Sequence, residues 1–237
     1  MNSFVEQIDR AWYSGFGAHW DDELLRRKIL AHLQPSSAVL DLGAGAGILS
    51  QMNFRGLTAS VCGVDLDPRV IGNPFLDEGR VADAGGIPYE NDRFDLVFSD
   101  NVLEHLEKPL EVFREVARVL SPGGVFLFKT PNKWHYVPAI ARLTPHGFHQ
   151  YVNRLRGRDE GDTFPTFYRA NTKSDVSRLA GRCGLSIISV ERIEGRPEYL
   201  RLAWPTYVLG AAYERLVNAS ELFAPGRVLL MGTLRKP

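Results

Sequence analysis

The sequence predicts an α/β protein built on a doubly wound, parallel β-sheet. Residues 39–47, Val-Leu-Asp-Leu-Gly-Ala-Gly-Ala-Gly, have the pattern of a buried strand that runs into a glycine-rich turn. Glycine permits the unusual dihedral angles of such a turn and lets its backbone approach a ligand closely. Residues 61–65 form a second apolar strand, which ends at Asp65. Beyond it, apolar strands alternate with amphipathic helices, which is typical of a sheet with helices on both faces.

The elements follow from periodicity and from helix start and stop signals. Residues 4–33 should form two helices that are broken near residues 14–17, and the second should take Asp21 or Asp22 as its N-cap. Helix 107–120 should end at the Ser-Pro-Gly-Gly turn, helix 172–183 should be capped by Asn171 or Thr172, and residues 198–222 are apolar and helix-like. Strands are expected at 38–42, 60–64, 79–82, 94–98, 124–129, 185–192 and 228–234, with helices between the first five.

Composition narrows the class of protein. The 237 residues are enough for one large domain or a domain with a cap. Lys plus Arg and Asp plus Glu both number 28, so the net charge of zero gives no indication of a nucleic-acid partner. Cys62 and Cys183 are expected to be reduced thiols, and no signal-peptide or membrane-spanning pattern is present. We therefore expect a cytoplasmic protein.

The glycine turn predicts the kind of ligand. The dinucleotide fingerprint needs its third glycine at position 48, where Ile48 stands, and no Lys or Arg occurs between residues 39 and 52. Asp41, two residues before the first glycine, would repel a phosphate and attract a cation. Asp65, at the tip of the next strand, is placed to accept hydrogen bonds from ribose hydroxyls. S-adenosylmethionine fits these features because it has a ribose, a sulfonium and an ammonium but no phosphate.

Residues 36–131 resemble the class I S-adenosylmethionine-dependent methyltransferases, in particular the small-molecule, type 11-like group. The resemblance is carried by the glycine turn, Val64-Asp65, Val81-Ala82-Asp83-Ala84, Phe94 to Asp100, Val102-Leu103-Glu104-His105-Leu106 and Leu120 to Phe126, in this order. It implies a Rossmann-like sheet of seven strands, mostly parallel with an antiparallel terminal strand. It also implies helical cap insertions and S-adenosyl-L-methionine as the cofactor.

The resemblance assigns expected cofactor contacts residue by residue. The turn would line the methionine half of the cofactor through Asp41, Gly43, Ala44, Gly45 and Gly47. Further along the chain, Asp65 would bind the ribose, Leu66 would pack on the adenine, Asp83 and Ala84 would meet the adenine edge, and Asp100 and Asn101 would flank the cofactor at the mouth of the sheet.

Three histidines are candidates for the general base. His105 follows the fourth strand, and His146 and His149 lie in an aromatic, basic segment. Histidine is the side chain that most often accepts a proton near neutral pH, and each of these could instead have a structural role. His146 and His149 have the spacing of a metal pair, but no third ligand at suitable spacing accompanies them, so no metal is predicted.

The remaining segments predict where the acceptor binds. The whole chain, 1–237, is interpreted as one methyltransferase domain, with a helical cap at 1–35 and substrate-cap insertions at 132–171 and 193–226. The arginines of the 132–171 insertion favour an anionic or sugar-like acceptor. The apolar stretch 199–213 could pack in the core, join a homodimer, touch a membrane surface or receive a lipid-linked acceptor.

The predicted activity is O-methylation of a small-molecule, sugar or lipid-linked glycan acceptor. No nucleic-acid partner is expected, and the Asn/Asp-Pro-Pro-Tyr/Phe motif of enzymes that methylate amino groups is absent after the fourth strand. Two alternatives stay open. One is a non-catalytic protein that binds S-adenosylmethionine or serves as a scaffold. The other is a nucleotide-dependent oxidoreductase or epimerase, which would need the phosphate fingerprint that this turn lacks.

Overall fold

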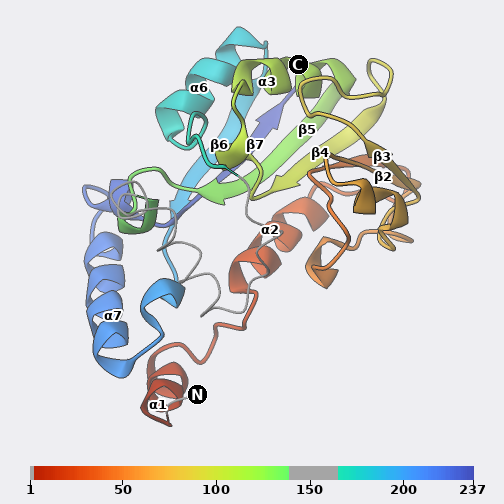
Figure 1. The fold of residues 1–237 in the computed structure, drawn as a ribbon. Helices are drawn as coiled ribbons and strands as arrows, with labels where there is room; N and C mark the ends of the chain where they lie inside the picture. The colour runs from red at the N-terminus through yellow and green to blue at the C-terminus, as the bar shows by residue number, and fades with distance from the viewer. Residues whose placement is uncertain (1–2, 139–164) are drawn as a thin grey trace. The chain divides into compact units, whose positions relative to one another are not determined.

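A computed structural model describes residues 3–138 and 165–237 (Figure 1). The chain divides into two compact units. The sheet unit comprises residues 19–130, 167–191 and 230–237, and the helical unit comprises the described residues among 1–18, 131–166 and 192–229. All of the predicted cofactor contacts fall in the sheet unit.

The sheet has seven strands in the order β3-β2-β1-β4-β5-β7-β6. These are β1 (Ala38–Leu42), β2 (Ser60–Asp65), β3 (Glu78–Val81), β4 (Phe94–Asp100), β5 (Leu120–Pro131), β6 (Ser186–Ile193) and β7 (Leu229–Arg235). The first five strands pair in parallel with one another. β7 is antiparallel to β5, because Gly123 N–H donates to Lys236 O at one end and Asn132 N–H donates to Val228 O at the other. The predicted mixed sheet and its strand positions are confirmed to within a few residues.

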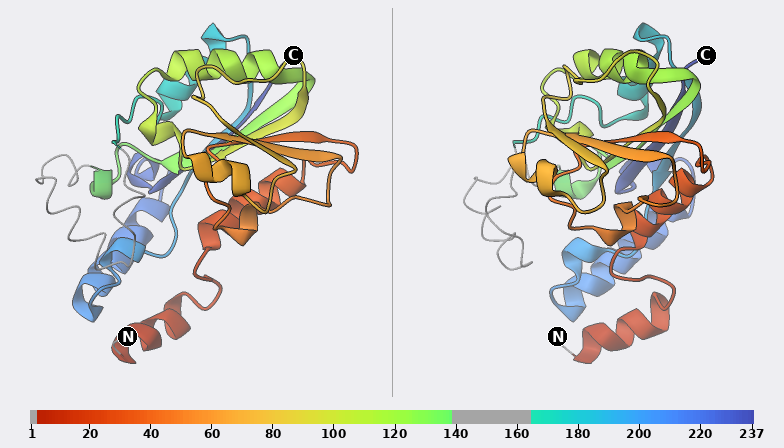
Figure 2. Two further views of the ribbon diagram at one scale, coloured as in Figure 1. Left: turned by 45° about the vertical axis from the view of Figure 1, so that its right-hand side comes forward. Right: turned by 90° about the vertical axis from the view of Figure 1, so that its right-hand side faces the viewer.

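Helices cover both faces of the sheet (Figure 2). α3 (Pro109–Val119) and α6 (Lys173–Arg182) pack on one face, against alternate strand residues such as Leu40, Val97 and Phe126. α2 (Trp20–Leu30) lies over the other face with Leu25 and Ile29 buried. Register places Asp41 beside Phe98 and Asp100 beside Lys129, and because side chains alternate along a strand, these four share the face opposite the α3–α6 layer. The carboxyl edge of this face is therefore polar.

Two local predictions are wrong. Full helices do not form between the first four strands: the described connections hold only the short 3₁₀ turns Ser50–Met52 and Pro68–Gly72. Glycine and proline are frequent in these connections, and both disfavour helix interiors. Neither Asp21 nor Asp22 caps α2, whose N-cap position is His19 without a side-chain cap bond. The cap of α6 is as expected, with Thr172 Oγ1 accepting from Asp175 N–H at 3.1 Å.

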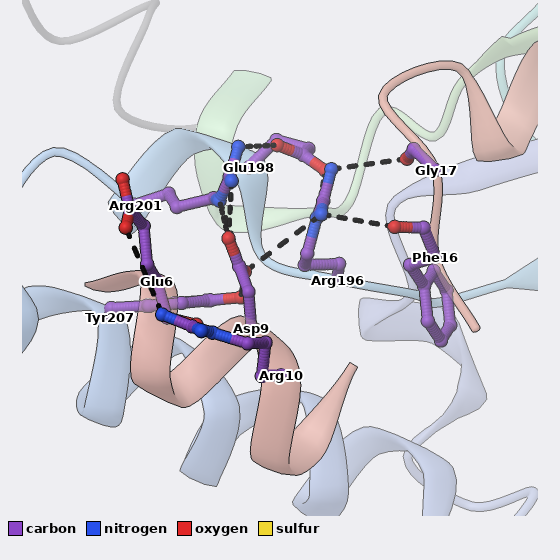
Figure 3. A network of polar contacts seen from close by, with 9 residues as sticks. All are labelled: Glu6, Asp9, Arg10, Phe16, Gly17, Arg196, Glu198, Arg201 and Tyr207. Carbon is purple, nitrogen blue, oxygen red and sulfur yellow. Dashed lines mark hydrogen bonds and ion pairs between the residues drawn. The ribbon is translucent and has the colours of Figure 1, made fainter. Parts of the chain in front are cut away.

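The helical unit is organised around buried ion pairs (Figure 3). It contains α1 (Ser3–Trp12) and α7 (Trp204–Asn218), so the expected helix at 198–222 is present only in part. Asp9 of α1 accepts hydrogen bonds from Arg201 and from the Tyr207 hydroxyl of α7. Arg196 is almost fully buried, lies 3.8 Å from Asp9, and donates to the carbonyl oxygens of Phe16 and Gly17. Despite the opposing effect of burial, Arg201 and Tyr207 lower the pKa of Asp9. These contacts fix α1 against α7.

A second buried polar pair in the helical unit, Glu194 and His135, favours neutral rather than charged side chains. Glu194 Oε2 lies 3.7 Å from His135 Nε2 and accepts from Val228 N–H at 2.8 Å. Burial raises the pKa of Glu194 to about 8 and lowers the pKa of His135 to about 3. The fold therefore favours the neutral form of both side chains.

We expect Glu194→Gln to remove a pH-dependent loss of stability. The folded pKa of Glu194, about 8, exceeds the ordinary value of 4.5, so the wild-type protein should lose stability as pH rises from about 4.5 through 8. Glutamine cannot ionise and can still accept from Val228 N–H. Thermal melts at pH 5 and pH 8 should show similar midpoints at pH 5 and a higher midpoint for the variant at pH 8. Parallel pH profiles for the two proteins would contradict this.

A second prediction concerns the contact between Gly232 of β7 and Phe128 of β5. A Cβ on Gly232 would lie 2.2 Å from the Phe128 ring, whereas a Cβ on Gly181 of α6 would meet nothing within 4 Å. Gly232→Ala should therefore cost about 1–3 kcal/mol of unfolding free energy through overpacking. The control Gly181→Ala should be neutral or stabilising by up to about 1 kcal/mol, because alanine favours a helix. Urea denaturation measures both, and equal effects would refute the packing argument.

Candidate functional site

The glycine turn after β1 needs glycine at both of its ends, residues 43 and 47. Gly43 and Gly47 have φ values of +86° and +72°, which L-residues with side chains rarely adopt. A Cβ on Gly43 would lie 2.3 Å from Val102 Cγ2, and one on Gly47 would lie 2.2 Å from Asn73 Oδ1. A Cβ on Gly45 would meet only Asp65 Oδ2, at 3.9 Å. The turn therefore packs tightly on protein at its two ends and is open at its centre, beside Asp65.

Asp65 and Asn73 hold this turn in place. Asp65 Oδ2 accepts from Gly45 N–H, and Oδ1 accepts from Asp67 N–H, both at 2.8 Å. Asn73 Nδ2 donates to the carbonyl oxygens of Ala44 at 3.0 Å and Gly45 at 3.2 Å. Asp65 thus couples the end of β2 to the glycine turn, which is where a ribose-binding carboxylate should be. Asn73 was not predicted from the sequence, because an Asn before a proline reads as an ordinary turn residue.

Negative charge gathers at the carboxyl ends of β1 and β4. Asp41 is buried, and burial together with the neighbouring charges of Asp100 and Asp65 raises its pKa well above the usual range. Burial raises the pKa of Asp100 to about 7, although Lys129, whose Nζ lies 2.9 Å from Asp100 Oδ1, opposes the shift. Both oxygens of Asp100 are buried without a hydrogen-bond partner among the described residues. A cation placed here would relieve the electrostatic cost of these carboxylates.

The predicted adenine contacts, Leu66, Asp83 and Ala84, directly follow β2 and β3. Ala82 N–H donates to Asp65 O at 2.9 Å, so Asp83 and Ala84 follow β3 directly beside the end of β2. Leu66 is 62% exposed, so its apolar side chain is accessible to a flat ligand such as adenine. Asp83 is exposed and accepts from Gly85 N–H at 2.7 Å, so it also has the turn role that any loop aspartate could have.

Asn101, Glu104 and His105 complete the site after β4. Asn101 is exposed and has a φ of +54°, an uncommon backbone conformation that is often found at functional sites. Glu104 is buried, and its Oε2 accepts from Thr130 Oγ1 at 2.9 Å, while Asn171 Nδ2 donates to the same Thr130 oxygen at 2.7 Å. His105 Nε2 lies 3.9 Å from Glu104 Oε1, with 31% of its side chain exposed. An imidazole is thus presented next to a fixed, buried carboxyl group.

Two other candidates cannot be placed. His146 and His149 lie outside the described residues. Among the residues that are described, no group of three or more His, Cys, Asp or Glu side chains is arranged to hold a metal ion. Over the same residues, no helix is both long and apolar enough to cross a membrane.

The geometry fits S-adenosylmethionine rather than a phosphate-bearing ligand. The turn leaves room at Gly45 beside the Asp65 carboxylate, and the neighbouring strand ends carry the buried carboxyl groups of Asp41 and Asp100. Residues 40–128 match the protein family described as methyltransferase domain. The chain carries a class I S-adenosylmethionine-dependent methyltransferase domain. S-adenosyl-L-methionine is its cofactor.

Known proteins resemble the methyltransferase domain in sequence and fold. A ubiquinone biosynthesis O-methyltransferase from Burkholderia pseudomallei (strain 1710b) is 28% identical over 190 residues, which cover 73% of this chain and 74% of the relative. An S-adenosylmethionine-dependent methyltransferase from Mesorhizobium loti superposes with a TM-score of 0.55 at 22% identity, over 92% of this chain and 98% of its own. Phosphoethanolamine N-methyltransferase 2 of Haemonchus contortus gives 0.60 at 19% identity, over 100% of this chain and 60% of its own. At these identities the two structures establish the fold.

The methyltransferase site also contains charged residues that sequence reasoning missed. Lys129 of β5 is fully buried and contacts Asp21 and Asp22 of α2 as well as Asp100. A signal was available, because Lys129 is the one charged residue in the apolar run 125–129 of an expected buried strand. The role of Asp21 and Asp22 had no such signal, since an acidic pair at the start of a helix usually reads as a cap.

The neighbours Asp65 and Asp67 allow a matched test of the ribose contact. We expect Asp65→Ala to weaken binding of S-adenosylmethionine at least tenfold, because it removes the ribose acceptor and releases Gly45. Asp67 accepts from Arg69 N–H at 2.8 Å at the start of a 3₁₀ turn, so Asp67→Ala should lower stability slightly and leave affinity unchanged. Calorimetric titration and thermal melts separate the two effects. Equal affinity losses in both variants would contradict the assignment.

Proposed function

We propose that the enzyme methylates a hydroxyl oxygen of a small-molecule acceptor, with His105 as the general base. The observation that carries this proposal is the placement of His105 beside Glu104, directly after the strand that ends at Asp100. A hydroxyl acceptor loses its proton as its oxygen attacks the methyl carbon, so a base is needed within reach of that oxygen. A partly exposed imidazole at the cofactor edge of the sheet meets this need.

Glu104 supports the proposed role of His105. Its carboxyl group is fixed by Thr130, and its carbonyl oxygen accepts from Phe167 N–H at 2.7 Å. Burial raises the pKa of Glu104, while the adjacent His105 opposes that shift. The attraction is mutual, so an ionised Glu104 would stabilise the imidazolium that forms when His105 takes up the acceptor's proton. Because the carboxyl group cannot move away, the orientation of the pair is set before the acceptor arrives.

The other site residues bind and orient. S-adenosylmethionine, when bound, supplies a methyl group that its sulfonium makes electrophilic. Asp41 and Asp100 would face its cationic half, and Asp65 would hold the ribose, so that the methyl carbon has a fixed position. The acceptor oxygen must then lie in line with the bond that breaks, and positioning of this kind contributes several orders of magnitude in rate.

We further propose an acceptor with an apolar, lipid-linked part. The relative from Burkholderia pseudomallei is named for ubiquinone biosynthesis, which supports a hydroxylated acceptor of this kind. In the helical unit, α1 and the start of α7 form an apolar groove lined by Phe4, Gln7, Ile8, Ala11, Trp12 and Trp204. Phe4, Trp12 and Trp204 are each about half exposed, so this groove offers apolar surface to a lipid tail. A lipid-linked glycan and a prenylated phenol are the two head-group classes to compare.

Replacement of His105 tests the proposed base. His105→Gln should lower kcat about 100- to 10,000-fold with a hydroxyl acceptor, because no base is then present to take up the hydroxyl proton. The affinity for S-adenosylmethionine should stay unchanged. His32→Gln, at the far end of α2, is the matched control and should behave as wild type. Radiolabelled methyl transfer to a panel of prenylated catechols, simple phenols and polyprenyl-linked sugars gives the rates.

Each outcome of this assay decides one part of the proposal. Wild-type turnover in His105→Gln would exclude this residue as the base. Turnover restricted to amines, or to acceptors without an apolar part, would overturn the proposed methylated atom or the proposed acceptor class.

A further inference from the structure

A fully buried lysine links the first turn of α2 to the cofactor edge of the sheet. Lys129 Nζ lies 2.8 Å from Asp21 Oδ2 and 2.9 Å from Asp100 Oδ1, and it also contacts Asp22 Oδ1. The side chain of Lys129 has no exposed surface, and those of Asp22 and Asp100 are about 10% exposed. We refer to Asp21, Asp22, Asp100 and Lys129 as the lysine cluster.

Backbone register explains why these groups meet. Asp100 and Lys129 are Cα partners on parallel strands, so their side chains leave the same face of the sheet side by side. Asp41 lies on the same face, because its partner Phe98 is two residues before Asp100. α2 covers this face (Figure 1), and Asp21 and Asp22 of its first turn contact Lys129 near the end of β5. The lysine cluster is therefore part of the edge where the cofactor site lies.

The charges of the lysine cluster do not balance. Lys129 Nζ donates hydrogen bonds to Asp21 and Asp22 and forms an ion pair with Asp100. One positive charge thus serves three carboxyl groups, with Asp41 as a fourth nearby. The other titratable groups that face the cluster are His19, whose Nδ1 lies 3.1 Å from Asp22 Oδ2, Asp65 through Asp41, and Glu104. The surplus is negative, and Asp100 is the member whose two buried oxygens lack a hydrogen-bond partner among the described residues, with the ion pair to Lys129 on Oδ1.

We propose that Lys129 is a positioning residue for the cofactor, and that Asp21 and Asp22 compete with Asp100 for its ammonium group and so set the charge that Asp100 presents to S-adenosylmethionine. The inference rests on the placement of Asp100 in the cofactor site but not on the identity of the acceptor. Lys129 favours an ionised Asp100, whereas the two carboxylates of α2 favour a protonated one. The first turn of α2 thereby tunes the charge of Asp100.

This arrangement makes cofactor affinity depend on pH near neutrality. Burial raises the pKa of Asp100 to about 7, against the influence of Lys129 and with that of Asp22. A protonated Asp100 has lost its attraction for a cation. Affinity for S-adenosylmethionine should therefore be highest above pH 7 and should fall as pH drops through that value.

Substitutions of opposite sign test the inference. In Lys129→Met the loss of the cation should raise the pKa of Asp100 and move the midpoint of the affinity profile up by about one to three pH units. In Asp22→Asn the loss of the anion should lower that pKa and move the midpoint down. Calorimetric titration of S-adenosylmethionine from pH 5.5 to 9 measures the midpoints. Lys28→Met is the control: Lys28 is also on α2, but its partner is Glu191 at 2.7 Å, and the midpoint should not move.

A merely structural role would weaken binding in both variants without opposite shifts, and that outcome would overturn the inference. A shift in Lys28→Met equal to that in Lys129→Met would do the same. If Lys129→Met does not fold, Asp21→Asn provides the second variant, because Asp21 is the more exposed carboxylate and should shift the midpoint in the same direction as Asp22→Asn. The readout is cofactor binding alone, so failure of the proposed acceptor chemistry leaves it unaffected.

Discussion

The accumulation of carboxylates at one edge of the sheet is the constraint on which the rest of the site depends. Asp41, Asp65 and Asp100 end β1, β2 and β4, and a parallel sheet places these ends together. Like charges in a low-dielectric setting repel, so each must find a partner or keep a proton. Asp65 accepts hydrogen bonds from two backbone N–H groups, and Asp100 forms an ion pair with Lys129. Asp41 has no ion pair within the described part of the chain.

The partners of these carboxylates account for several features that would otherwise be unrelated. The glycine turn closes on Asp65 because Gly45 N–H is one of those partners. α2 packs on the face opposite α3 and α6, and its acidic first turn shares the ammonium of Lys129. The charge that stays uncompensated is negative and lies at the carboxyl ends of β1 and β4, beside the glycine turn. A cationic cofactor is therefore the ligand that relieves the electrostatic cost, and this links the stability of the edge to its function.

In the helical unit, the buried charges of Asp9 and Arg196 are paired with each other and with neighbouring groups. Asp9 and Arg196 are both largely buried, and each has several hydrogen-bond partners from other parts of the unit. Its remaining surface is different in kind, since Phe4, Trp12 and Trp204 stay exposed around a groove. The unit thus combines a hydrogen-bonded polar interior with accessible apolar surface.

The sequence by itself determined the fold class, the seven strands and the glycine turn, because each is written in local patterns: alternation, glycine spacing and a carboxylate at a strand end. It also determined the Thr172 cap, which depends only on residues within one turn. Tertiary structure alone decided the roles of Asn73, Asp21, Asp22 and Lys129, because their partners lie 28 to 108 residues away in the sequence. It also decided that the early connections form short 3₁₀ turns rather than full helices. Local patterns cannot show which distant side chain will share a proton or a charge. That depends on how strand register and the packing of α2 bring the groups together.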